Sequence, residues 1–238
     1  MKKSLKNQIK AILFDLDGTL LEINLNLFIR DYLKGLSACI AHILPPKKFI
    51  PFLMKISRKM DDNNGKETNE DVFKKMFFPF MGHSREEIEP IFMKFYEQEF
   101  PKLEQHAKEK PEARPLMQYV FDKGYDVVIA TSPLLPRIAI EERLQWAGVA
   151  VADFPYNMIT SYENMRSSKP NLLYYKQILA TINHPPEACI MVGDENKDMV
   201  AAHLGIHTFL VPSPETKLDP STPEPNFRGP LADLKNLM

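Results

Sequence analysis

The pattern of apolar and polar positions divides the chain into two kinds of segment. Short, uninterrupted apolar runs end abruptly in polar residues, which is typical of strands buried on both faces of a parallel sheet. In the other segments apolar positions recur every three or four residues, which predicts amphipathic helices. The predicted strands cover residues 9–15, 125–131, 158–160, 188–192 and 207–211.

Helical periodicity fills most of the intervals between the later strands. Because strands and helices alternate, we expect an α/β fold with a doubly wound parallel sheet. The segment 212–230 has six prolines and no clear period, so it is predicted to be a surface connection. The expected helices of this part cover residues 115–124, 134–147, 170–182, 197–204 and 231–238.

The stretch between the first and second strands has a different character, because helical periods replace strand-like runs. A helix is predicted over 25–44, and the prolines that follow it leave room for at most a short helix near 52–56. Thr68 and Ser84 are candidate caps of two more helices. The many aromatic residues are interpreted as core packing. This pattern predicts a helical domain over 21–107, inserted into an α/β domain formed by 1–20 and 108–238.

Composition and charge exclude several classes of function. The chain has 238 residues, 44% of them hydrophobic, and a net charge of −1, so nothing indicates a nucleic-acid or membrane partner. Charged residues interrupt the most apolar stretch, which rules out a transmembrane span there. Cys39 and Cys189 are interpreted as free, buried thiols of a reducing compartment. The first residues show no signal-peptide pattern, and we expect a cytoplasmic protein.

Candidate chemistry begins at the end of the first strand, in the segment AILFDLDGTL (11–20). Asp15 and Asp17 lie one residue apart and point the same way if strand geometry persists. Gly18 allows a sharp turn directly after them. Two carboxylates at the edge of a sheet repel each other, and a hard divalent cation relieves that repulsion. The simpler alternative is a strand that ends in an acidic turn.

Further polar residues follow the later strands or precede a helix. Thr131 and Ser132 follow the second strand, where a hydroxyl and a backbone N–H can hold a phosphate oxygen. Lys169 precedes a helix, where the positive end of the helix dipole makes a nearby anion more plausible. Asp194 and Asp198 follow the apolar run 188–192 in the segment GDENKD. Each has a structural alternative, namely a turn, a solvated charge or a helix cap.

These four elements, in this order and setting, resemble the motifs of the haloacid dehalogenase superfamily, most of whose members are Mg²⁺-dependent phosphatases. The resemblance covers residues 9–20 and 110–211. It implies a Rossmann-like core, and the helical stretch resembles the cap that many members insert between the first two motifs. The general likeness is to phosphoglycolate-phosphatase-like and β-phosphoglucomutase-like members.

The resemblance also assigns roles to the motif residues. Asp15 is the expected nucleophile, which forms an aspartyl-phosphate, and Asp17 the expected general acid and base. Asp198 is expected to orient a metal-bound water or to pair with Lys169. Mg²⁺ is the expected cofactor, held by Asp15, the backbone carbonyl of Asp17, and Asp194. The expected phosphate-binding residues are Gly18, Thr131, Ser132 and Lys169, of which Thr131 and Lys169 are also expected to act in catalysis.

The expected reaction is hydrolysis of a small phosphorylated metabolite. Dehalogenases of the superfamily lack an aspartate at the position of Asp17, which favours phosphoryl transfer. Two alternatives remain, a phosphomutase or phosphotransferase and a catalytically silent binding protein. The motifs do not distinguish hydrolase from mutase, and neither substrate identity nor oligomeric state follows from the sequence.

Overall fold

The computed structural model describes residues 8–213 and 216–238. Residues 1–7, where no signal peptide was expected and where the predicted α/β domain begins, lie outside the described residues. The same holds for positions 214 and 215 of the proline-rich connection.

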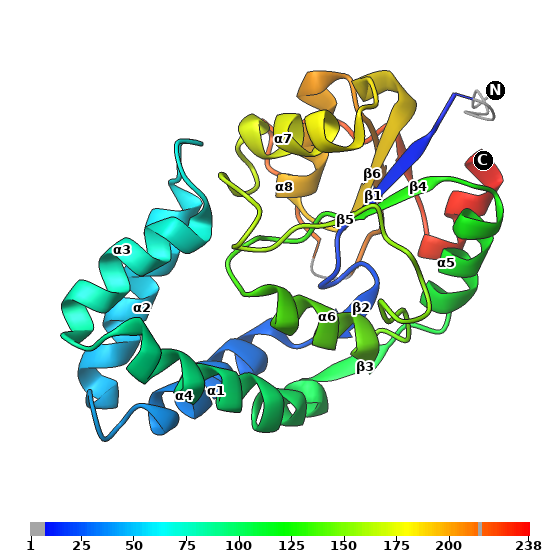
Figure 1. Cartoon of the computed structure of the whole chain (residues 1–238). Helices are drawn as coiled ribbons and strands as arrows, with labels where there is room; N and C mark the ends of the chain where they lie inside the picture. The colour runs from blue at the N-terminus through cyan, green and yellow to red at the C-terminus, as the bar shows by residue number, and fades with distance from the viewer. Residues whose placement is uncertain (1–7, 214–215) are drawn as a thin grey trace.

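A six-stranded sheet forms the centre of the larger part of the molecule (Figure 1). Every pairing within it is parallel, and β1 lies between the strand that precedes Thr131 and the strand that precedes Asp194. The prediction of a doubly wound α/β fold is therefore confirmed. In order across the sheet the strands are β5 (Met158–Ile159), β4 (Asp126–Ile129), β1 (Ala11–Phe14), β6 (Cys189–Gly193), β7 (His207–Leu210) and β8 (Phe227–Arg228).

Successive residues of β1 belong to two different cores, because strand side chains alternate between the faces of a sheet. Ile12 and Phe14 pack with α5 (Ala113–Asp122), α6 (Arg137–Trp146) and the 3₁₀ helix η4 (Leu231–Leu237). Ala11 and Leu13 pack with α7 (Leu172–Ile182) and the 3₁₀ helix η3 (Val200–Leu204), which continues α8 (Asn196–Met199). All four β1 residues are fully buried, as the uninterrupted apolar run predicted. The short η2 (Pro186–Ala188) leads into β6.

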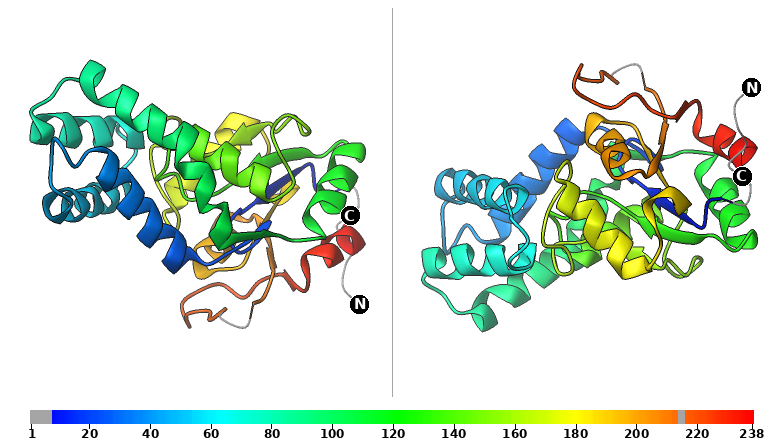
Figure 2. Two further views of the ribbon diagram at one scale, coloured as in Figure 1. Left: turned by 90° about the horizontal axis from the view of Figure 1, so that it is seen from below. Right: turned by 90° about the horizontal axis from the view of Figure 1, so that it is seen from above.

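Four helices between β1 and β4 lie beside the sheet instead of covering it (Figures 1 and 2). We call α1–α4 the helical insertion. They are α1 (Leu25–Cys39), α2 (Pro46–Asp61), α3 (Asn69–Met81) and α4 (Arg85–Gln98), followed by the 3₁₀ helix η1 (Phe100–His106).

An antiparallel pair of short strands, absent from the sequence-based expectation, joins the insertion to the sheet. In this pair β2 (Leu21–Ile23), where the chain leaves the core, lies against β3 (Ala107–Glu109), where it returns. The domain boundaries at 20/21 and 107/108 remain our proposal.

The expectation of at most a short helix near 52–56 is wrong, because α2 runs from Pro46 to Asp61. Pro46 begins the helix, where its missing N–H costs nothing. Pro51 lies inside and removes one backbone hydrogen bond, which costs about 3 kcal/mol in an isolated helix. Burial of Phe49, Leu53 and other residues on one face of α2 offsets that cost, since tertiary packing supplies most helix stability in proteins.

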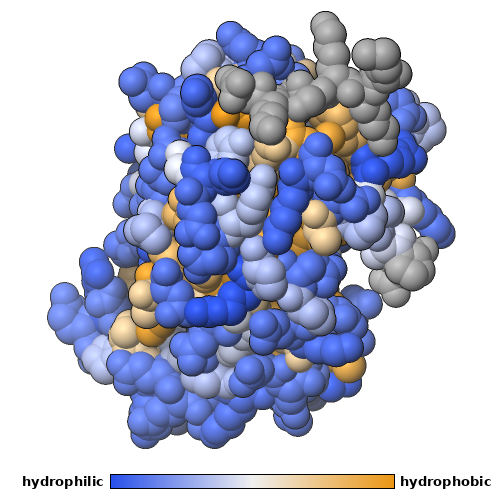
Figure 3. Space-filling view, turned by 90° about the vertical axis from the view of Figure 1, so that its right-hand side faces the viewer, coloured by the Kyte–Doolittle hydropathy of each residue, from blue (hydrophilic) through white to orange (hydrophobic). Residues whose placement is uncertain are grey.

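The remaining differences concern the end of the chain and the cysteines. The proline-rich connection contains β8, and the expected terminal helix is the 3₁₀ helix η4. Both cysteines are free, but Cys39 is only partly buried, whereas Cys189 is fully buried. No helix in the described ranges is long and apolar enough to cross a membrane. The side of the molecule that carries α5 and the C-terminus is mainly hydrophilic, with scattered apolar patches (Figure 3).

Candidate active site

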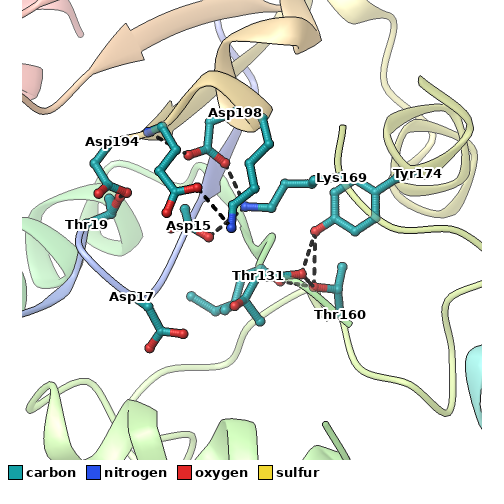
Figure 4. Close-up of polar contacts among 12 residues, drawn as sticks. Asp15, Asp17, Thr19, Thr131, Thr160, Lys169, Tyr174, Asp194 and Asp198 are labelled. Atoms are coloured by element: carbon teal, nitrogen blue, oxygen red, sulfur yellow. Dashed lines mark hydrogen bonds and ion pairs between the residues drawn. The ribbon is translucent and has the colours of Figure 1, made fainter. Parts of the chain in front are cut away.

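Three neighbouring strands at the centre of the sheet end at one place, and each is followed by a predicted site residue. Asp15 follows β1, Thr131 comes just after β4, and Asp194 follows β6 (Figure 4). Main-chain bonds hold the ends in register, with Asp15 N 2.9 Å from Val192 O. Parallel strands bring their carboxyl ends to one edge, which is where open α/β sheets bind ligands.

The turn after Asp15 needs glycine at position 18 for two reasons. Gly18 has φ +86°, a left-handed conformation that other residues adopt only with strain. A Cβ atom there would also overlap the Asp194 carboxylate. The main-chain carbonyl of Gly18 accepts a hydrogen bond from Lys110, which follows β3. Sequence reasoning missed Lys110, because nothing in the pattern distinguishes it from a solvated surface lysine.

Lys169 joins the first motif to the last. Its side chain is fully buried, and its Nζ lies 2.6 Å from Asp15 Oδ1 and 2.6 Å from Asp198 Oδ1 (Figure 4). Burial by itself lowers the pKa of Lys169, but the two carboxylates outweigh it and hold the pKa well above its ordinary value. Lys169 is therefore a fixed positive charge in contact with the expected nucleophile.

Asp15, Asp194 and Asp198 form an acidic cluster, with one oxygen of each within 4.8 Å of the other two. Burial, together with the charges of Asp15, Asp198 and Glu195, raises the pKa of Asp194 to about 7. Thr19 donates a hydrogen bond to Asp194 at 3.2 Å. Lys169 contacts two of these three crowded carboxylates, and its one charge leaves an excess of negative charge among them. Hard oxygen donors suit Mg²⁺. The donor set therefore fits a divalent cation.

The Asp17 side chain turns away from this cluster and toward α6 (Figure 4). Strand β1 ends at Phe14, so the strand geometry that would point Asp15 and Asp17 the same way does not persist. Its Oδ2 accepts a hydrogen bond from Arg143 of α6, whose side chain is 4% exposed and lies 5.9 Å from the Phe28 ring centre. Asp17 Oδ1 is buried and has no hydrogen-bond partner within the described part of the chain. Burial raises the pKa of Asp17, Arg143 opposes the rise, and Asp15 adds to it. Sequence reasoning missed Arg143, because an arginine on a helix is usually solvated.

Two buried hydroxyl groups hold the loop that follows β4. The hydroxyl groups of Tyr174 and Thr160 donate to the Thr131 carbonyl oxygen at 2.9 and 2.8 Å (Figure 4). Both donors are fully buried. Thr131 and Ser132 line the same cavity as Asp15. The structure therefore brings the second motif to the same cavity as the first.

The cavity has a volume of about 770 Å³ and extends from these residues into the helical insertion. Asp15, Asp17 and Thr131 line one end. All four helices of the insertion contribute to the remaining wall. The interpretation of the insertion's aromatic residues as core holds for Phe77 and Phe95, which are buried. Phe28 and Tyr32 are buried as well, and they also line the cavity. Four partly buried aromatic residues pack against this core and line the cavity too, namely Phe73, Phe78, Phe92 and Tyr96.

Residues 9–204 match the family model of haloacid dehalogenase-like hydrolases. The chain belongs to this family. No curated protein matches it at the level of sequence. The resemblance drawn from the motifs is thus confirmed for the family, whose hydrolase fold the chain shares.

Solved structures of this family share the fold over nearly the whole chain. A 2-haloacid dehalogenase from Pseudomonas syringae is 19% identical, covers 96% of this chain and 97% of its own, and has a TM-score of 0.60. A predicted phosphoglycolate phosphatase from Haemophilus somnus is 17% identical, with coverage of 97% and 98% and a TM-score of 0.56. CbbY from Rhodobacter sphaeroides, in complex with phosphate, is 17% identical, with coverage of 95% and 96% and a TM-score of 0.56.

Proposed function

We propose that this hydrolase is a Mg²⁺-dependent phosphatase that cleaves a phosphomonoester of a small molecule through an aspartyl-phosphate on Asp15. The observation that carries the proposal is the acidic cluster of Asp15, Asp194 and Asp198 around the buried Lys169. A phosphate dianion approaches a carboxylate only where cations screen both charges. Lys169 supplies one of these positive charges, and the acidic cluster is suited to bind a divalent cation that supplies a second.

The first half of the reaction transfers the phosphoryl group to the protein. A carboxylate oxygen of Asp15 attacks phosphorus, the bond from phosphorus to the ester oxygen breaks, and Asp17 gives its proton to the leaving alkoxide. The raised pKa of Asp17 supports the protonated form that this step needs. Lys169, the Thr131 hydroxyl and the N–H group of Ser132 would surround the phosphoryl oxygens. The N–H group of Gly18, which was expected to join them, instead donates to the main-chain oxygen of Leu21 at 2.8 Å.

The second half releases phosphate. Asp17, now ionised, takes a proton from water, whose oxygen attacks the phosphorus of the aspartyl-phosphate, and the bond to Asp15 breaks. Arg143 holds one Asp17 oxygen in both halves, so the carboxyl group keeps its direction. The helical insertion covers the site from the other side and excludes bulk water.

Asp15, Asp194 and the Asp17 carbonyl would hold Mg²⁺, with Asp198 beside them. When bound, the ion offsets the negative charge that builds up on the phosphoryl oxygens. Two related structures support this function, since one is a predicted phosphoglycolate phosphatase and the other is a complex with phosphate.

The fold also occurs in a 2-haloacid dehalogenase. Dehalogenation is therefore the alternative activity that an experiment must distinguish from phosphate-ester hydrolysis. The aspartate at position 17 supports phosphoryl transfer, because it provides an acid and base that lines the same cavity as Asp15. A mutase shares the first half-reaction and would give an isomer of a sugar phosphate, not free phosphate.

The experiment measures nitrophenol release from p-nitrophenyl phosphate, with Mg²⁺ and with excess EDTA. We expect Mg²⁺-dependent turnover, which Asp15→Asn lowers by at least about 10³-fold. The matched control, Asp122→Asn, changes an exposed aspartate at the end of α5 and keeps the activity. Chloride release from 2-chloropropionate without phosphatase activity would overturn the proposal.

A further inference from the structure

The wall of the cavity beyond the catalytic end is mainly apolar. On α1, Leu25, Ile29, Leu33 and Leu36 recur at helical spacing, so that one stripe of the helix faces the cavity. Met54 of α2 and Met93 of α4 line the same space. A carbon chain placed there would contact hydrocarbon from three helices.

Several of these side chains are unusually exposed for their size. Ile29, Met54 and Met93 are 45%, 38% and 46% exposed, yet all three belong to this one cavity. Apolar side chains gathered at one concave place, as opposed to scattered singly, mark a binding site. The free energy gained on removing them from water is available to a ligand that covers them.

Charged groups on the insertion side of the cavity are mostly neutralised within their own helices. Lys74 pairs with Glu70 at 2.7 Å, and Arg85 pairs with Glu89. Arg58 of α2 also lines the cavity, and it forms no ion pair within the described residues. A second phosphate or a carboxylate would therefore find Arg58 there, whereas Lys74 and Arg85 are already paired. The positive charges in contact with the expected reacting carboxyl groups, Lys169 and Arg143, belong to the core.

The volume of the cavity also favours a substrate with a large alcohol portion. Ligand cavities of about 300–1,000 Å³ hold drug-sized molecules, and this cavity has about 770 Å³. A phosphate ester of a two-carbon alcohol would fill the catalytic end and leave the apolar wall in water. Continuity between the catalytic end and this wall fixes the orientation, with phosphate at Asp15 and the alcohol portion along α1.

We propose that the substrate is a phosphomonoester whose alcohol portion is a long or bulky apolar group, bound along the α1, α2 and α4 wall of this cavity. The proposal rests on the proposed phosphatase function and names its substrate class.

The test compares butyl, hexyl and octyl phosphate with phosphoglycolate and glycerol 3-phosphate, in the full-length protein with Mg²⁺. Each methylene that leaves water is expected to raise kcat/KM about threefold, which gives about 10²-fold between butyl and octyl phosphate. Equal kcat/KM along the alkyl series, or a preference for phosphoglycolate, would overturn the substrate class while leaving the phosphatase function intact.

A matched pair of variants on α1 locates the binding surface. Ile29→Asn places an amide in the cavity wall and is expected to lower the octyl-to-butyl ratio about tenfold. Leu27→Asn, on the same helix and 36% exposed, lies outside the cavity and should keep the ratio. Because both side chains are exposed, neither change should prevent folding. Equal effects of the two substitutions would contradict the proposal.

Binding of non-hydrolysable alkylphosphonates separates the two proposals. If no ester is hydrolysed, the phosphatase function has failed, and calorimetric titration with butyl- and octylphosphonate still tests the cavity. Octylphosphonate that binds at least tenfold more tightly than butylphosphonate supports an apolar ligand. Equal affinities for butyl- and octylphosphonate would overturn the proposal of an apolar ligand.

Discussion

The catalytic end and the insertion end of the cavity are built in opposite ways. At the catalytic end charged side chains hold one another, as Lys169 does with Asp15 and Asp198 and Arg143 does with Asp17. At the insertion end apolar side chains from helices form a wall, and some of them are left half-exposed. In the proposed reaction, the sheet therefore fixes the groups that act on the phosphoryl group, whereas helix packing shapes the space for the alcohol portion of the substrate.

The largest effect should come from removing the charge shared by the first and last motifs. Lys169→Met leaves Asp15 and Asp198 buried without their counter-ion, which costs about 3–5 kcal/mol of unfolding free energy. Turnover of p-nitrophenyl phosphate should fall at least about 10³-fold, because the phosphate loses its fixed cation. Chemical denaturation and steady-state kinetics measure the two effects.

Lys176→Met is the matched control, since Lys176 lies on the exposed side of α7. It should change stability by less than about 0.5 kcal/mol. Equal losses in the two variants would show that the Lys169 ion pairs contribute nothing particular to the catalytic end.

Arg143 comes next, because it touches both regions. Arg143→Met leaves the buried Asp17 without its partner, and we expect a loss of about 3 kcal/mol in unfolding free energy. Turnover should fall roughly 10–10²-fold, since Asp17 is no longer held in one direction. Arg137→Met, on the same helix but 43% exposed, should cost less than about 1 kcal/mol. Unchanged turnover in Arg143→Met would show that Arg143 does not position Asp17 for the reaction.

The acidic cluster should respond to Mg²⁺ through stability as well as activity. At a Mg²⁺ concentration of 100 times Kd, the wild type should gain about 2.7 kcal/mol, a rise in Tm of roughly 5–10 °C. Asp194→Asn should lose this response. An equal Mg²⁺ shift in both proteins, measured by thermal denaturation, would place the ion elsewhere.

Asp194→Asn should also change how the stability of the metal-free protein depends on pH. Because the pKa of Asp194 is raised to about 7, its contribution to stability is greatest below its ordinary pKa and is lost as pH rises through 7. In EDTA at pH 8, Asp194→Asn should therefore unfold at a higher temperature than the wild type. Asp122→Asn serves as the control and should follow the wild type at every pH.

The smallest effect is expected in the insertion. Tyr32 and Tyr96 share a hydrogen bond of 3.0 Å between their hydroxyl groups. Tyr32→Phe leaves the Tyr96 hydroxyl without this partner and should cost about 1–2 kcal/mol of unfolding free energy. Turnover of p-nitrophenyl phosphate should change less than about threefold, because the pair lies in the insertion. A large fall in kcat would mean that the insertion takes part in the chemistry.

The contrast between the catalytic end and the insertion end of the cavity also explains what could be predicted from the sequence. Asp15, Thr131 and Asp194 were found because each follows a buried strand, and parallel strands bring such ends together. The contacts of Lys169 with Asp15 and Asp198 fit the expected pairing. Their catalytic and metal-binding roles remain proposals. The family followed from the motifs and their order.

Other features left no local signal. The contact between Arg143 and Asp17 joins α6 to the turn after β1, and periodicity says nothing about such long-range pairs. Prolines suggested that α2 would be broken, but burial along one face outweighed the lost hydrogen bond. The cavity arises from the mutual packing of four helices, so its apolar wall could not be distinguished from ordinary core in the pattern of a single helix.

The most direct measurement of the central claim is covalent trapping of the intermediate. The protein is incubated with acetyl phosphate and Mg²⁺, quenched in acid and analysed by mass spectrometry after proteolysis. The account predicts a phosphoryl group on Asp15, accumulating further in Asp17→Asn, which cannot activate water, and absent from Asp15→Asn. A phosphoryl group on another residue, or none in any of the three proteins, would contradict it.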